Sequence, residues 1–277
     1  MRETSNPVFR SLPKTQGGYA QFGTGAAGYG AQQVHAQPYT EYTDQRQTGV
    51  SRPLTIDDVV TKTGISLAIV SAVAVVAYFF VAANPALLMP AFFIGSFGGL
   101  ALVLIATFGR KQDNPAIVLS YAAFEGVFVG TASFLFANLV STGGPAMIFQ
   151  AVVATFGVFF GMLVVYKTGA IRVTPKLTRM IVAGIFGVVA LAIVNILFAI
   201  FTGNAPLTDG GPLAIGFSLL CIALASFSFL IDFDAADQMI RAGAPEKAAW
   251  GIALGLTVTL VWLYIEILRL LSYFNND

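Results

Sequence analysis

From Thr63 onward the chain is a succession of long apolar runs separated by short polar breaks. Each run is long enough to cross the hydrocarbon core of a bilayer as a helix, which takes about 20 residues. The alternation that marks a strand is absent, and helices satisfy their own backbone hydrogen bonds inside a bilayer. The pattern predicts an all-α polytopic membrane protein with a seven-helix transmembrane domain over 55–275 and spans at about 63–83, 86–108, 115–138, 145–166, 179–201, 212–236 and 250–272.

The breaks between the runs carry turn chemistry. Proline is tolerated in the first turn of a helix because the N–H groups there have no partner within the helix. Four predicted helices have a proline at or near their start, in Asn84-Pro85, Asn114-Pro115, Gly143-Gly144-Pro145 and Gly210-Gly211-Pro212. Within the runs, glycines recur four residues apart, a spacing that lets helix backbones approach closely. We expect packing within the bundle, with dimerisation as the alternative, at the pairs Gly95 and Gly99, Gly126 and Gly130, Gly157 and Gly161, and Gly251 and Gly255.

Composition separates the N-terminal segment from the rest of the chain. The whole sequence is 56% hydrophobic and 10% charged, whereas roughly a quarter of residues are charged in soluble domains. Residues 1–52, in contrast, are polar and rich in Gly, Gln and Tyr. Such a segment has too little apolar surface to fold, which predicts a disordered tail.

The basic residues predict the orientation in the membrane. Fourteen of the fifteen basic residues lie before the first span, or in or beside the connections between spans two and three, four and five, and six and seven. The other three connections contain none. Basic residues collect on the cytoplasmic side. We therefore expect a multi-pass protein of the cell (plasma or inner) membrane, with a cytoplasmic N-terminus and an external C-terminus.

Several function classes find no support in the sequence. The net charge of +1 gives no reason to expect a nucleic-acid partner. Cys221 is the single cysteine, His35 is the single histidine, and no protease or phosphate-binding motif occurs. We expect neither an enzyme nor a cofactor, and the metal ligands and oligomeric state stay open. The expected partners are the lipid bilayer and cations or protons.

The candidate chemistry lies in carboxylates within apolar runs. Glu125 falls near the middle of the third span, where an ionised group costs about 2.5 kcal/mol or more. It must be neutral, paired or in contact with water. One interpretation is an ion or proton site that lines a polar path, and the alternative is a protonated carboxyl that hydrogen-bonds within the bundle.

Four charged residues of the last two spans are further candidates. Glu266 and Arg269 are three residues apart in the seventh span, so they can meet on one helix face as a structural ion pair. Asp232 and Asp234 lie near the predicted cytoplasmic end of the sixth span, about 200° apart around a helix, so at most one of them faces a given pore axis. A turn near Gly243 sets Asp232 opposite a residue near position 256 of the seventh span.

These C-terminal segments resemble the Bax inhibitor family of transmembrane proteins in its bacterial form. Its last two helices each carry an acidic residue, in segments that match Asp232 to Ile240 and Leu263-Tyr264-Ile265-Glu266 here. The resemblance implies a pH-sensitive calcium leak channel in which two carboxylates share a proton and hold the pore closed. It makes Asp232 or Asp234 and Glu266 the pair, and Arg110 the basic partner of the latch.

The leading prediction is thus a seven-helix cation channel that passes Ca²⁺ under control of carboxylate protonation. Carboxylate oxygens are ligands of the kind that Ca²⁺ prefers. One alternative is a proton-coupled carrier that uses Glu125. The other is a membrane scaffold that recruits partners through residues 1–52.

Overall fold

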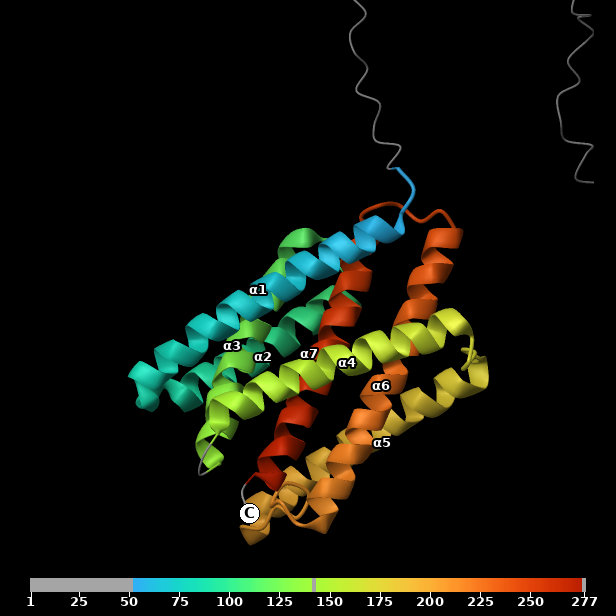
Figure 1. Ribbon diagram of the computed structural model, residues 1–277. Helices are drawn as coiled ribbons and strands as arrows, with labels where there is room; N and C mark the ends of the chain where they lie inside the picture. Colours follow the sequence, from blue (N-terminus) through green and yellow to red (C-terminus); the bar gives the residue numbers. More distant parts are fainter. Residues whose placement is uncertain (1–51, 141–142, 276–277) are drawn as a thin grey trace, which may run out of the picture. The chain divides into compact units, whose positions relative to one another are not determined.

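The computed structural model describes residues 52–140 and 143–275, and within these ranges the chain forms seven α-helices and one short 3₁₀ turn (Figure 1). All seven helices are long and apolar enough to cross a membrane. Their bounds are α1 Ile56–Ala83, α2 Leu88–Phe108, α3 Pro115–Leu139, α4 Gly144–Thr168, α5 Pro175–Thr202, α6 Pro212–Arg241 and α7 Ala248–Phe274, with the 3₁₀ turn η2 at Pro85–Leu87. The all-α seven-span prediction is confirmed. The tail predicted for 1–52 lies outside the described residues except for Arg52.

Most helices extend beyond the predicted spans, because polar residues at the membrane surface continue a helix whose apolar middle crosses the bilayer. The largest difference is at α1, which begins at Ile56 instead of residue 63. Thr55 stands before its first turn, and its backbone N–H and hydroxyl both donate to Asp58 Oδ2, at 3.0 and 2.6 Å. A carboxylate that accepts from the N-cap residue stabilises a helix start. At α3, Asn114 caps the helix by accepting from the Ala116 N–H at 2.9 Å.

The last helix, α7, is the centre of the bundle. It packs against α1, α3, α4 and α6, and Figure 1 shows it (red) passing between them. In its most apolar 18-residue window 72% of residues are buried, against at most 50% in any other helix. The two remaining helices, α2 and α5, pack mainly on α3 and on α6, respectively. Residues on α7 are therefore the ones that the rest of the domain surrounds.

The glycine pairs divide into close contacts and open surface. A Cβ on Gly95 of α2 would lie 2.6 Å from the backbone nitrogen of Phe128 on α3, and one on Gly130 of α3 would overlap the backbone oxygen of Ala74 on α1. The expected close packing is thus confirmed where α1, α2 and α3 meet. The expectation is wrong for Gly157 and Gly161, because nothing lies within 4 Å of a Cβ at either position of α4.

Candidate functional site

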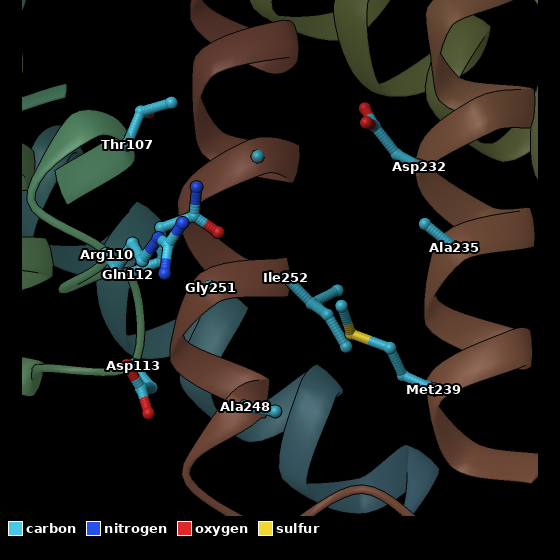
Figure 2. Close-up of a pocket in the computed structure, with 11 residues that line it drawn as sticks. Thr107, Arg110, Gln112, Asp113, Asp232, Ala235, Met239, Ala248, Gly251 and Ile252 are labelled. Atoms are coloured by element: carbon cyan, nitrogen blue, oxygen red, sulfur yellow. The ribbon is translucent and has the colours of Figure 1, made fainter. Parts of the chain in front are cut away.

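One end of the bundle, called the basic end below, carries Arg52, Lys62, Arg110, Arg241 and Lys247. Here the α2–α3 turn, the end of α6 and the start of α7 line an open cavity of about 350 Å³. Figure 2 shows the lining: Asp232, Ala235 and Met239 on α6, with Arg110, Gln112 and Asp113 on the other side of α7. The cavity therefore combines one membrane carboxylate with charged groups of a surface turn.

Asp232 is held by the helix opposite. The Thr259 hydroxyl donates a hydrogen bond to Asp232 Oδ2 at 2.7 Å across the interface between α6 and α7, the α6–α7 seam. Gly255, one turn earlier on α7, leaves space beside the carboxylate, because a Cβ there would lie 3.8 Å from Asp232 Oδ1. One carboxylate oxygen is thus oriented by a hydroxyl, while the group remains part of the cavity wall. This register agrees with the short turn read from the sequence.

Arg110 occupies an unusual backbone position. Its φ of 52° makes it the one non-glycine residue with positive φ in the described part of the chain. The amide of Lys111 donates to the carbonyl of Ala106 at 2.9 Å, and that of Arg110 donates to Thr107 at 3.4 Å. This is the Schellman ending of a helix, in which glycine normally takes the left-handed position. An arginine there costs about 1–2 kcal/mol in backbone conformation relative to glycine.

An ion pair joins the two turns at the mouth of the cavity. Lys247 Nζ, just before α7, lies 3.1 Å from Asp113 Oδ2, just before α3. The hydrogen bond from Lys247 holds the pKa of the Asp113 carboxyl below its usual value. The α2–α3 turn and the α6–α7 turn are therefore tied together beside Asp232.

The segment before α1 is fastened to the same α6–α7 turn. Leu54 N–H donates to the Ala244 carbonyl at 2.8 Å, and Glu246 N–H donates to the Arg52 carbonyl at 3.1 Å. The Glu246 carboxylate also pairs with Arg52 Nε at 3.2 Å and with Lys62 Nζ at 3.3 Å. We call this set of contacts the clasp. It connects the point where the described chain begins to the loop between the two helices of the site.

The other acids of α6, the predicted candidate Asp234 and the nearby Asp237, have local partners. Asp234 accepts from the Gln238 side chain at 2.6 Å, one turn along the same helix. Asp237 pairs with Arg241 at 2.8 Å, again one turn on. Neither residue lines the cavity.

The structure does not bring Glu266 to the acids of α6, so the carboxylate pair implied by the resemblance is not formed. Glu266 lies seven residues beyond Thr259 on α7, a rise of about 10 Å. Its side chain is buried and its Oε2 lies 3.3 Å from Arg269 Nη1. The physical reason is the tight α6–α7 turn, which brings Asp232 to the level of Gly255 and Thr259.

Glu125 sits in a separate place, between α2 and α3. A Cβ on Gly99 would lie 2.6 Å from Glu125 Oε2 and 3.8 Å from the ring of Tyr121, so this glycine makes room for both side chains. The carboxylate is partly buried and does not line the basic-end cavity. Asp232, Glu266 and Glu125 thus lie in three separate environments.

Sequence reasoning missed Thr259, Gln112, Asp113 and the space beside Gly255. The spacing Gly251-x-x-x-Gly255 was visible, but it indicated packing and not a cavity wall. Among the described residues, no group of three or more His, Cys, Asp or Glu side chains is arranged to hold a metal ion. The cavity lining contains two carboxylates, Asp232 of α6 and Asp113 of the α2–α3 turn.

Comparison with known proteins agrees with the C-terminal resemblance. A search of curated proteins gives no match. The family model described as Bax inhibitor 1 like matches residues 6–276, almost the entire chain. Seven membrane-length helices accompany that match. The chain belongs to the Bax inhibitor 1 like family of membrane proteins.

Proposed function

We propose that this protein is a pH-sensitive cation leak channel, with Ca²⁺ as a permeant ion, and that protonation of Asp232 controls it. The observation that carries the proposal is the position of Asp232, a carboxylate within a membrane-spanning helix that lines a cavity of about 350 Å³. Ionisable residues inside a membrane protein usually face a water-filled path and mark ion routes. Carboxylate oxygens are also suitable ligands for Ca²⁺.

The proposed switch uses one carboxylate and not two. When Asp232 is ionised it attracts cations into the cavity, and the Thr259 hydroxyl orients it. A proton on Asp232 removes that attraction and turns the group into a donor as well as an acceptor. Since Glu266 lies about two helical turns away along α7, it takes no part in this titration.

Arg110 supplies the opposing charge in this proposal. Its guanidinium lies at the cavity beside the α2–α3 turn (Figure 2). A fixed positive charge there repels entering cations or pairs with the ionised carboxylate when the cavity narrows. By the distribution of basic residues, this mouth faces the cytoplasm.

Calcium flux into dye-loaded proteoliposomes, measured across a pH series, tests the proposal. Asp232→Asn should abolish the pH dependence of flux, whereas Glu266→Gln should retain it. Asp237→Asn is the matched control, since that carboxylate lies on the same helix but pairs with Arg241 outside the cavity. An unchanged pH profile for Asp232→Asn refutes the proposed switch.

The variant Arg110→Gly separates the effect of the guanidinium charge on flux from the effect of this position on stability. Glycine suits the left-handed backbone at this position, so the variant removes the guanidinium without straining the turn. Thermal stability should stay the same or rise, and flux should increase at every pH. A variant with native flux excludes Arg110 as the basic partner.

Glu125 favours a second candidate, a proton-coupled carrier. Its carboxylate belongs to the membrane-length helix α3 and lies against Gly99 of α2. In a carrier, Glu125→Gln abolishes substrate-dependent proton movement, whereas a passive leak through the basic-end cavity continues in that variant. The scaffold alternative depends on residues 1–52, and their deletion should leave the proposed ion flux intact.

A further inference from the structure

The bundle has a second hollow on the side where α1 and α4 lie on either side of α7 (Figure 1). Both helices pack on α3 and α7, but they make little contact with each other. The space between them is an open groove of about 560 Å³, with α1 and α4 as its walls and residues of α3 and α7 as its floor. We call it the α1–α4 groove. Its size is typical of ligand sites, which measure about 300–1,000 Å³.

Close packing on α3 keeps the two walls of the groove apart. A Cβ on Gly126 of α3 would lie 2.8 Å from the backbone oxygen of Val70 on α1. A Cβ on Gly144, at the start of α4, would lie 2.5 Å from the backbone oxygen of Ala137 on α3. Helices packed this closely have little freedom to shift. The groove is therefore a fixed part of the fold.

The lining of the groove offers a ligand apolar surface. No charged residue of the described chain lines it. Its three buried hydroxyls have partners within the protein, since Thr155 donates to the Ala151 carbonyl at 2.7 Å. Ser133 donates to the Val129 carbonyl at 2.6 Å, and Tyr264 Oη lies 2.7 Å from Ser133 Oγ. A carboxylate or an ammonium group would lose its hydration here without gaining a partner. The part of a ligand that fits the groove is therefore hydrocarbon.

The length and position of the groove match one leaflet of a bilayer. On α1 it extends from Leu67 to Phe79, a rise of about 18 Å. Half of a hydrocarbon core of about 30 Å is about 15 Å. The groove reaches Phe79 near the end of α1 and Pro145 in the first turn of α4, so it lies toward the end of the bundle opposite the basic end.

We propose that the α1–α4 groove binds one acyl chain of a phospholipid in the leaflet opposite the basic end. Hydrocarbon chains surround the walls of the groove in a bilayer, and a phospholipid keeps its polar headgroup outside, at the membrane surface. A helix from a second copy of the protein does not fit. A helix about 10–12 Å wide and 18 Å long occupies roughly 1,400–2,000 Å³, well above the volume of the groove.

The bound chain contacts the central helix away from Asp232. Thr259 of α7 faces Asp232 on α6. The α7 residues that line the groove are Leu260, Val261 and Tyr264, which lie about 100–200° around the helix from Thr259. The inference therefore concerns a separate lipid site and does not depend on whether the protein conducts ions.

Photocrosslinking of the full chain in nanodiscs tests the site. The probe is phosphatidylcholine with a diazirine in the middle of one acyl chain, diluted in unlabelled phosphatidylcholine. Leu260 and Val261 are 3% and 5% exposed, so lipid that only surrounds the bundle does not reach them. Peptide mass spectrometry should find the probe on residues 260–264. Label on Phe186 of α5, which is exposed to lipid, serves as the internal reference.

Two double variants distinguish a bound chain from general contact with lipid. Val75→Trp with Val152→Trp places bulky side chains on the two walls and should lower the label on 260–264 several-fold relative to Phe186. Val76→Trp with Val153→Trp is the matched control, because these neighbours are also exposed but do not line the groove. This control should keep the native label. The proposal is overturned if 260–264 carries no label in the native chain, or if the two double variants are labelled equally there.

Discussion

Three glycine-to-alanine changes should separate close helix packing from the placement of Glu125. At Gly95 the new Cβ would meet the backbone of Phe128 at 2.6 Å. At Gly99 it would meet the Glu125 carboxylate at 2.6 Å, and at Gly157 it would meet nothing within 4 Å. The same methyl group thus enters a rigid contact, a movable contact and open surface.

The size of each effect follows from what can move. A backbone cannot yield without separating α2 from α3, and overpacking of this kind costs about 1–3 kcal/mol. Alanine gains about 0.5–1 kcal/mol over glycine within a helix. Gly95→Ala should therefore lower the free energy of unfolding by up to about 2 kcal/mol. Gly157→Ala should raise it by about 0.5–1 kcal/mol.

Gly99→Ala lies between these cases. The Glu125 carboxylate is the end of a flexible side chain and can rotate away, so the steric cost and the gain in helix propensity nearly cancel. Stability should stay close to the native value while the carboxylate changes position. Such a variant tests the Glu125 carrier hypothesis without unfolding the bundle.

Unfolding of all three variants in mixed detergent micelles, measured under one condition, gives the order of their stabilities. We expect Gly157→Ala to be the most stable, Gly99→Ala to resemble the native chain and Gly95→Ala to be the least stable. Equal stability of Gly95→Ala and Gly157→Ala would refute the close approach of α2 and α3. A strong loss in Gly99→Ala would show that the Glu125 carboxylate has no room to move.

Three further changes address the basic end. Thr259→Val removes a hydroxyl that donates to a carboxylate at 2.7 Å and should cost about 1.5–3 kcal/mol, whereas Thr259→Ser should be close to native in a detergent unfolding assay. Because Lys247 lowers the pKa of Asp113, the ion pair stabilises the fold fully above the usual aspartate pKa of about 4. This stabilisation is lost as the pH falls below about 4 and through the lowered pKa of the folded state. Asp113→Asn should therefore reduce thermal stability slightly at neutral pH and not in strong acid, and an equal loss at both would contradict this. Glu246→Gln weakens both ion pairs of the clasp and should speed hydrogen exchange at the Leu54 amide, which an intact clasp protects.

The sequence predicts the helices well because the bilayer imposes strict rules. A span needs about 20 apolar residues and a backbone whose hydrogen bonds are satisfied within the helix. Basic residues collect in the connections on one side of the membrane, so they occur in every second connection. The ends are less predictable, since hydropathy reports burial in lipid and not helix geometry. The first turn of α1 contains Asp57 and Asp58, yet it is helical because Asp58 accepts from Thr55.

The site is only partly predictable for a different reason. Asp232 stands out because a carboxylate in an apolar run is rare, and this needs no knowledge of its neighbours. Its partner Thr259 is an ordinary polar residue of α7, and only the rotation of that helix brings its hydroxyl to Asp232. Asp113 resembles any surface residue in sequence, and its contact with Lys247 joins turns more than 130 positions apart.

The position of α7 at the centre of the bundle explains why its two polar sites need not act as a pair. Thr259 and Glu266 lie on the same face of α7, but the side chains between them on the α6–α7 seam are apolar and buried. Two carboxylates share a proton only when their oxygens approach within hydrogen-bonding distance, and a rise of about 10 Å along a helix prevents this. Protonation of Asp232 can therefore influence Glu266 only if α6 or α7 shifts as a body. In the channel that we propose, the proton sensor lies at the basic end and Glu266 lies beyond the buried side chains of Ala225, Phe229 and Leu263, so conduction along the seam would require these side chains to separate.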